Sequence, residues 1–161
     1  MQALVIFESV SDASRDVARA VGDGLFHLVG IDVEVVPAAA AAALLGDLDL
    51  LVVGGPARAE DERGGPSDAV GTWLRHLGTV AGTAAATFDT RVLGDDGPSA
   101  AAVIGERLTG RGYRPIAAAE SFRVDATGVL LPGEADRAKV WGEGLGRTVV
   151  AAHLPRPRMP I

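Results

Sequence analysis

The chain has 161 residues and a mass of 16.4 kDa, which is the usual length of one globular domain. Its 48% apolar and 22% charged residues are close to globular averages and exclude extended disorder. A net charge of −6 argues against a surface for nucleic-acid backbones, and the absence of Cys excludes disulfides, thiolate metal sites and cysteine nucleophiles.

Apolar strands alternate with amphipathic helices from the first residues onward. Residues 3–8 form a continuous apolar run, which is typical of a strand buried on both faces of a parallel sheet. Between residues 14 and 29, apolar side chains recur every three or four positions, which predicts a helix that Gly30 ends. Further strands are predicted at residues 31–36, 48–53, 84–88 and 114–124, and further helices at 38–45, 66–80, 99–112 and 134–153.

This alternation predicts the doubly wound α/β class, with a five-stranded parallel sheet covered by helices on both faces. The order 2-1-3-4-5 fits best, and ligands in such folds bind at the carboxyl ends of the strands. The loops after Glu8, Gly55 and Phe88 are therefore where a site is expected. We expect one domain over residues 1–153, followed by a proline-rich tail at 154–161.

Four short strings resemble the flavodoxin-like family, in particular its short bacterial flavodoxin-domain proteins. They are Val5-Ile6-Phe7-Glu8-Ser9, Val52-Val53-Gly54-Gly55-Pro56, Ala86-Thr87-Phe88-Asp89-Thr90-Arg91 and Glu120-Ser121-Phe122-Arg123-Val124. The resemblance covers about residues 1–150. It implies a non-covalent FMN cofactor and electron transfer between redox partner proteins.

The same resemblance places the FMN phosphate at the loop formed by Ser9, Val10, Ser11, Asp12, Ala13 and Ser14. Hydroxyls and backbone N–H groups at a helix N-terminus suit a phosphate. However, Asp12 stands where the family has Gly, and Ala13 where it often has Asn. Two unit charges about 4 Å apart repel by ~4 kcal/mol at a dielectric of about 20, so Asp12 disfavours a phosphate. Ser11 and Asp12 are also ordinary helix N-cap residues, and the capping interpretation is favoured over a phosphate site.

By the same resemblance, Pro56, Ala57, Thr90 and Arg91 lie beside the flavin ring. Residues 57–65 contain no aromatic side chain to flank that ring, and the third loop offers only Val92 and Leu93. Acidic residues gather around the same loops: Glu60, Asp61, Glu62, Asp89, Asp95 and Asp96. Such a rim suits docking to a basic redox partner, and it is also typical of solvated loops.

Other chemistries find less support. Receiver domains share this strand order but need an Asp at the end of the third strand, where this chain has Gly54-Gly55. The three histidines fall in three different helices without the spacing of a metal site, which favours exposed or capping roles. The glycine pairs inside the first and last helices indicate close helix packing rather than dinucleotide binding.

Two functions thus remain open. The first is a diverged flavodoxin-like protein that binds FMN weakly or not at all and acts as an interaction or regulatory module. The second is a working FMN electron carrier or small flavin oxidoreductase. The N-terminus enters a strand without a basic leader and no apolar run reaches about 18 residues, so a cytoplasmic location away from membranes is expected.

Overall fold

A computed structural model describes residues 1–42, 45–57 and 68–155 of the chain. Its elements in chain order are β1 (Gln2–Phe7), α1 (Asp12–Phe26), β2 (Asp32–Pro37), the 3-10 helix η1 (Ala38–Ala40), β3 (Leu50–Pro56), α2 (Asp68–His76), β4 (Ala84–Val92), α3 (Ala100–Gly110), β5 (Arg114–Pro115), β6 (Glu120–Val124) and α4 (Glu134–His153).

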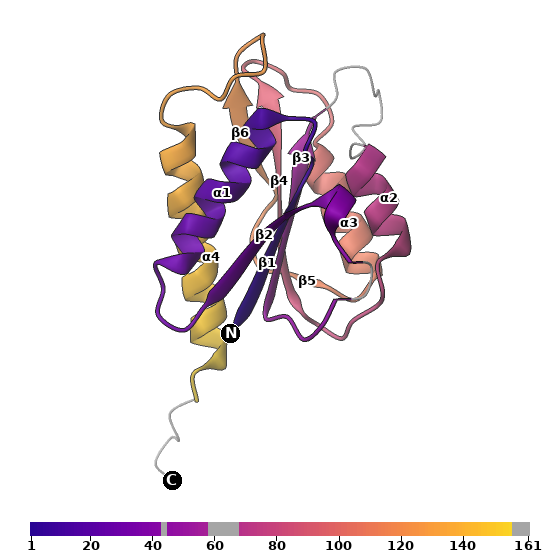
Figure 1. The fold of residues 1–161 in the computed structure, drawn as a ribbon, viewed down its shortest axis with the longest axis vertical. Coiled ribbons are helices and arrows are strands. Elements are labelled where there is room, and N and C mark those ends of the chain that lie inside the picture. The colour runs from indigo at the N-terminus through magenta and orange to yellow at the C-terminus, as the bar shows by residue number, and fades with distance from the viewer. Residues whose placement is uncertain (43–44, 58–67, 156–161) are drawn as a thin grey trace.

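The strands form one sheet in the order β2-β1-β3-β4-β5, with β6 also paired to β4, and every strand pair is parallel. In the centre of this sheet, Val5 of β1 lies between Val35 of β2 and Val52 of β3. The predicted doubly wound fold and its strand order are confirmed. Figure 1 shows the strands running side by side, with β6 and β5 at opposite ends of β4.

The predicted fifth strand, residues 114–124, is split in two. β5 pairs with Ala84 and Ala85 of β4, whereas β6 pairs with the last five residues of β4. Pro115 has no N–H to donate, which suits a short strand at the edge of a sheet. Ile116 still donates to the Ala85 carbonyl at 3.0 Å, after which the chain leaves β4 until Glu120.

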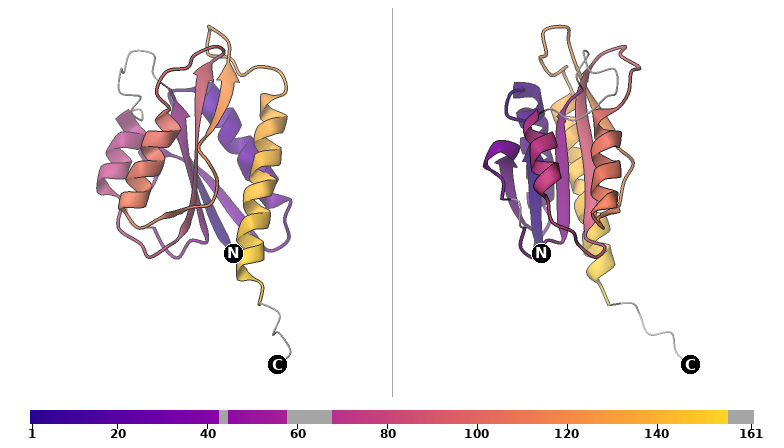
Figure 2. Two further views of the ribbon diagram at one scale, coloured as in Figure 1. Left: turned by 180° about the vertical axis from the view of Figure 1, so that it is seen from behind. Right: turned by 90° about the vertical axis from the view of Figure 1, so that its right-hand side faces the viewer.

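The helices lie in two layers, with α1 and α4 on one face of the sheet and α2 and α3 on the other (Figures 1 and 2). Each helix layer covers a separate apolar core on its face of the sheet. Successive side chains of β1, β3 and β4 point alternately into one core or the other. Phe88 and Phe122 belong to the core under α1 and α4, and Leu51 and Ile104 to the core under α2 and α3.

Glycines allow α1 and α4 to approach closely, as the sequence indicates. A Cβ on Gly24 would clash with the backbone of Lys139, and a Cβ on Gly142 would clash with the backbone of Val21. Helices can come this close only where a side chain is missing on both surfaces. The contact fixes α1, whose N-terminus carries the candidate phosphate loop.

The predicted boundaries of three helices are wrong. The helix predicted at 38–45 is only η1 within its described part, since Trp73 Nε1 donates to the Ala42 carbonyl at 2.9 Å and holds the chain there in another conformation. α1 begins two residues earlier than expected and ends at Phe26, before a turn that leads to Gly30 at a φ of 89°. α2 ends at His76, although Leu77 beyond it is still buried.

Candidate functional site

The carboxyl edge of the sheet, where β1, β3 and β4 end, brings the predicted site loops together. Glu8, just past β1, donates its N–H to the Gly54 carbonyl of β3 at 3.2 Å. Ala57, just past β3, donates to the Thr90 carbonyl of β4 at 2.8 Å. The three strand ends are thus adjacent, as the predicted fold requires.

The phosphate loop predicted by resemblance ends in an ordinary N-cap. The hydroxyl of Ser11 accepts from the Ser14 N–H at 3.2 Å, and α1 begins at the next residue, Asp12. Ser9 and Val10 lie in a turn and are exposed. Because the first N–H groups of a helix have no acceptor within the helix, those of Asp12 and Ala13 remain directed at the space before α1.

Ser14 is buried, although the resemblance assigns its hydroxyl to a phosphate. Its side chain is fully buried, and its Oγ lies 3.3 Å from Oγ1 of Thr90, which is itself 3% exposed. This hydrogen bond joins α1 to β4 beneath the loop. The hydroxyls of Ser9 and Ser11 therefore lie at the loop surface, whereas that of Ser14 does not.

Asp12 lies on the outer surface of α1. Its side chain is 83% exposed and forms an ion pair with Arg15 at 2.5 Å. An acidic residue in the first turn also complements the helix dipole. Ala13, by contrast, is buried against the core and leaves little room for the Asn that the family often has.

β4 runs four residues further than predicted, and this changes the place of two candidate residues. Thr90 and Arg91 were expected in the loop beside a flavin ring, yet both lie in β4 and are buried. β3 on one side and β6 on the other pair with this extension, which supplies backbone partners that a loop would lack. The loop that follows β4 therefore begins at Leu93.

The side chain of Arg91 is hydrogen-bonded to the loop that follows β4. Its guanidinium donates to the Pro98 carbonyl at 2.8 Å and to the Asp95 carbonyl at 3.4 Å. Its Nε lies 3.5 Å from Oδ1 of Asp89, an ion pair too long for a good hydrogen bond. Arg123 of β6 also donates to the Asp95 carbonyl, at 3.3 Å. Two cationic side chains thus converge on one loop carbonyl.

Two buried carboxylates at the strand ends are structural features that the sequence analysis missed. Glu8 accepts from the Val70 N–H near the start of α2 at 3.2 Å. Asp89 accepts from the Ala101 N–H of α3 at 3.1 Å and from the Ser99 hydroxyl at 2.9 Å. An acidic residue that directly follows an apolar run in the sequence was the available signal. Asp89 is therefore not part of an acidic rim, which is a correction to the sequence-based expectation.

The exposed surface around the loops is partly apolar. Val10 is 78% exposed, Val92 42% and Leu93 65%, so the first loop, the last residue of β4 and the start of the third loop present aliphatic side chains to solvent. Glu60, Asp61 and Glu62, predicted for the second loop, lie outside the described residues. Asp96 is exposed and Asp95 half-buried, so the described part of the acidic rim is reduced to these two.

The turn between β6 and α4 is held by an arginine–carboxylate cluster. Arg137 contacts Glu134 at 2.8 Å and Glu120 at 2.6 Å, and its guanidinium carbon lies 4.4 Å from the Phe122 ring centroid. The hydrogen bond from Arg137 lowers the pKa of Glu134, and its carboxylates in turn raise the pKa of Arg137. Glu134 also accepts from the Arg123 N–H at 2.7 Å, which secures β6 beside β4.

The histidines cap helix ends. His27, His76 and His153 each place Nδ1 within 2.9 Å of a carbonyl four residues earlier. Over the described ranges, no group of three or more potential ligands could hold a metal ion. No helix in this part of the chain is long and apolar enough to cross a membrane.

No protein-family model matches the chain, and no curated protein matches its sequence. Solved structures do match its fold. Flavodoxin 1 from Bacillus cereus is 16% identical with a TM-score of 0.75, covering 96% of this chain and 100% of that one. An archaeal flavodoxin is 16% identical with a TM-score of 0.73, covering 93% and 99%. A flavodoxin-like domain from Synechococcus is 21% identical with a TM-score of 0.61, covering 92% and 99%. This chain therefore has the flavodoxin-like fold.

Proposed function

We propose that this chain is a diverged flavodoxin-like protein that binds FMN weakly at its carboxyl edge and acts on a protein partner through that edge. The burial of Ser14 is the observation that carries the proposal. It removes one of the three hydroxyls that the resemblance assigns to a phosphate, because a fully buried Oγ bonded to Thr90 cannot reach a ligand.

The remaining phosphate donors are few. The hydroxyls of Ser9 and Ser11 and the first N–H groups of α1 would hold the phosphate. The guanidinium of Arg15, which could add a positive charge, is paired with Asp12. When bound, FMN supplies the capacity to take up and release electrons, and the chain supplies its orientation.

A working FMN electron carrier is the second candidate. Val10, Val92 and Leu93 favour it, because exposed aliphatic side chains at the first and third loops offer apolar surface to a flat ring. The outward position of Asp12 favours it too, since the carboxylate faces Arg15 rather than the space before the helix. Under this candidate the ring contacts compensate for the poor phosphate end.

A fluorescence-quenching titration with FMN, alongside riboflavin and inorganic phosphate, tests the proposal. We expect FMN to bind in the micromolar range or more weakly, and riboflavin, which lacks the phosphate, to bind about tenfold more weakly than FMN. Saturation at submicromolar FMN would overturn the proposal in favour of the working carrier.

A matched pair of serine variants locates the phosphate contacts. Ser9→Ala removes an exposed hydroxyl and should weaken FMN severalfold without changing stability. Ser14→Ala removes the buried hydroxyl and should leave FMN affinity unchanged while lowering the free energy of unfolding by about 1–2 kcal/mol, because Thr90 loses its partner. A severalfold loss of FMN affinity in Ser14→Ala would contradict the burial argument.

A further inference from the structure

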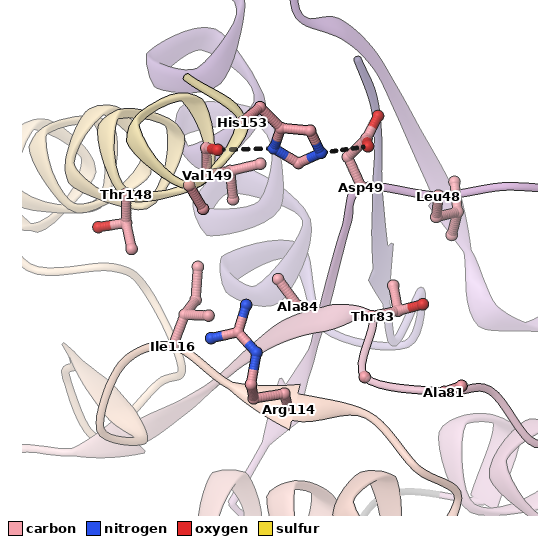
Figure 3. Close-up of a pocket in the computed structure, with 12 residues that line it drawn as sticks. Leu48, Asp49, Ala81, Thr83, Ala84, Arg114, Ile116, Thr148, Val149 and His153 are labelled. Carbon is pink, nitrogen blue, oxygen red and sulfur yellow. Dashed lines mark hydrogen bonds and ion pairs between the residues drawn. The ribbon is translucent and has the colours of Figure 1, made fainter. Parts of the chain in front are cut away.

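A pocket of about 230 Å³ lies at the amino edge of the sheet, opposite the carboxyl edge that holds the candidate cofactor site. It forms where β3, β4 and β5 begin and where α4 ends, and Figure 3 shows these segments around it. The residues that line it include Asp49, Ala84, Arg114, Ile116, Val149 and His153.

Arg114 is the cationic group directed into this pocket. In Figure 3 its guanidinium extends toward the space between Ile116 and Ala84. Within the described residues, that guanidinium has neither a hydrogen bond nor an ion pair. Thr148, by contrast, donates its hydroxyl to the Gly144 carbonyl at 3.0 Å, within its own helix. Arg114 is exposed, so its guanidinium presents unused donors both to the pocket and to solvent.

The acidic group of the pocket is already engaged. One oxygen of Asp49 accepts from the Gln2 N–H at 2.7 Å, and the other lies 3.0 Å from Nε2 of His153. Nδ1 of the same ring lies 2.8 Å from the Val149 carbonyl. Both carboxylate oxygens of Asp49 thus have a partner within the protein.

Of the charged side chains that line the pocket, Asp49 is held by Gln2 and His153, whereas the guanidinium of Arg114 has no partner within the described residues. The walls beside this cation are apolar: Val149 and Ala84 are buried, and Ile116 is half-buried. A planar guanidinium matches a carboxylate with two parallel hydrogen bonds. A dianion such as phosphate fits less well, because the carboxylate of Asp49 stands on the same rim.

We propose that this pocket binds a small organic monocarboxylate, with its carboxylate on the Arg114 guanidinium and a compact apolar body against Val149, Ile116 and Ala84. The site is independent of the flavin crevice, because it lies where the parallel strands begin rather than where they end. Occupation would join β5 to the last turn of α4.

Nitrogen-15 NMR of the full chain tests the proposal with benzoate as the probe and benzamide as its neutral counterpart, at constant ionic strength. Benzoate should produce saturable shifts in the amides of Ala84, Arg114 and Ile116 and in the Arg114 Nε–H. Benzamide should bind at least about tenfold more weakly, since it lacks the charge that the guanidinium recognises. Shifts linear in benzoate, equal affinity for benzamide, or preferential binding of inorganic phosphate would each overturn the proposal.

Variants separate this site from general anion binding. Arg114→Gln should abolish the saturable shifts, and Arg114→Lys should retain them only in part. Arg147→Gln, at an exposed position on α4, is the matched control and should bind as the natural chain does. Ala152→Phe fills the pocket from an exposed position and should block binding while Arg114 remains. Binding that survives either Arg114→Gln or Ala152→Phe would place benzoate elsewhere.

Discussion

Two strand-to-helix connections at the carboxyl edge both contain a serine N-cap, but the cap has a different surrounding in each. The turn from β1 into α1 and the loop from β4 into α3 both end in a serine cap, Ser11 and Ser99, with bonds of 3.2 and 3.1 Å to the third N–H beyond. In the first, the nearby carboxylate of Asp12 is in solvent. In the second, the carboxylate of Asp89 is buried behind the cap and bonded to it.

The difference shows how one edge can carry both an open helix N-terminus and a structural anchor. The β1–α1 turn leaves helix N–H groups and two hydroxyls unused by other parts of the chain, whereas the β4–α3 loop uses its donors internally. The hydrogen bond between Ser14 and Thr90 connects the two regions, because it joins α1 to β4. Changes in the β4–α3 loop should therefore affect stability first, and changes in the β1–α1 turn should affect ligand binding first.

Removing the buried carboxylate should have the largest effect. Asp89→Ala leaves the guanidinium of Arg91 buried without its carboxylate and takes an acceptor from α3. We expect the free energy of unfolding in urea to fall by about 3–5 kcal/mol. Asp96→Ala, at an exposed position of the same loop, is the control and should change it by less than about 0.5 kcal/mol. A loss below about 1 kcal/mol for Asp89→Ala would show that Asp89 is not an anchor.

Removing the Ser99 cap should lower the free energy of unfolding more than removing the Ser11 cap. Ser11→Ala should cost about 0.5–2 kcal/mol, the usual contribution of an N-cap. Ser99→Ala should cost more, by about 1 kcal/mol, because its hydroxyl also donates to Asp89. Urea unfolding of both variants, with the Ser99→Ala and Asp89→Ala double variant, measures the difference. Equal losses, or strict additivity in the double variant, would break the comparison.

The exposed carboxylate of the open turn should matter less. Asp12→Gly loses a surface ion pair and some helix propensity, which together should cost about 1 kcal/mol in the free energy of unfolding. Because the side chain already faces Arg15, affinity for inorganic phosphate should change by less than about threefold. Isothermal titration with phosphate checks this. A tenfold gain would show that Asp12 repels ligands despite its outward position.

The smallest effect concerns a third connection, from β6 into α4. The pKa of Glu134 is lowered in the folded chain, mainly by the hydrogen bond from Arg137. Its contribution to stability is therefore fully present above the ordinary glutamate pKa of about 4.3 and is lost as the pH falls through the lower folded value. The stability difference between the natural chain and Glu134→Gln should shrink on acidification. In an Arg137→Gln background most of this pH dependence should vanish, and its persistence would point to another partner.

Much of the fold could be predicted from the pattern of apolar residues. Residues 134–153 form α4 as expected, and the strand order follows from the alternation of buried strands and helices. The Ser11 cap was also among the sequence-based interpretations. These features are local, or they follow from rules of chain connection, so the sequence carries their signal directly.

The candidate site was only partly predictable. The sequence located its loops but not their boundaries, since Thr90 and Arg91 lie in β4 rather than beyond it. From its composition alone, the polar string Asp89-Thr90-Arg91 is typical of a loop. In the structure it is part of a strand, because β3 and β6 pair with its backbone on either side. Its side chains form hydrogen bonds with groups of the following loop and of α3.

The sequence by itself thus determined the class of fold, the topology of the sheet and the edge at which the site should lie. The tertiary structure alone decided which polar groups of that edge face solvent and which are buried. Ser14 meets Thr90 across 76 positions of the chain, and Glu8 meets Val70 across 62. A local pattern holds no information on such partners, and the partner determines whether a polar side chain at a strand end is solvated or buried.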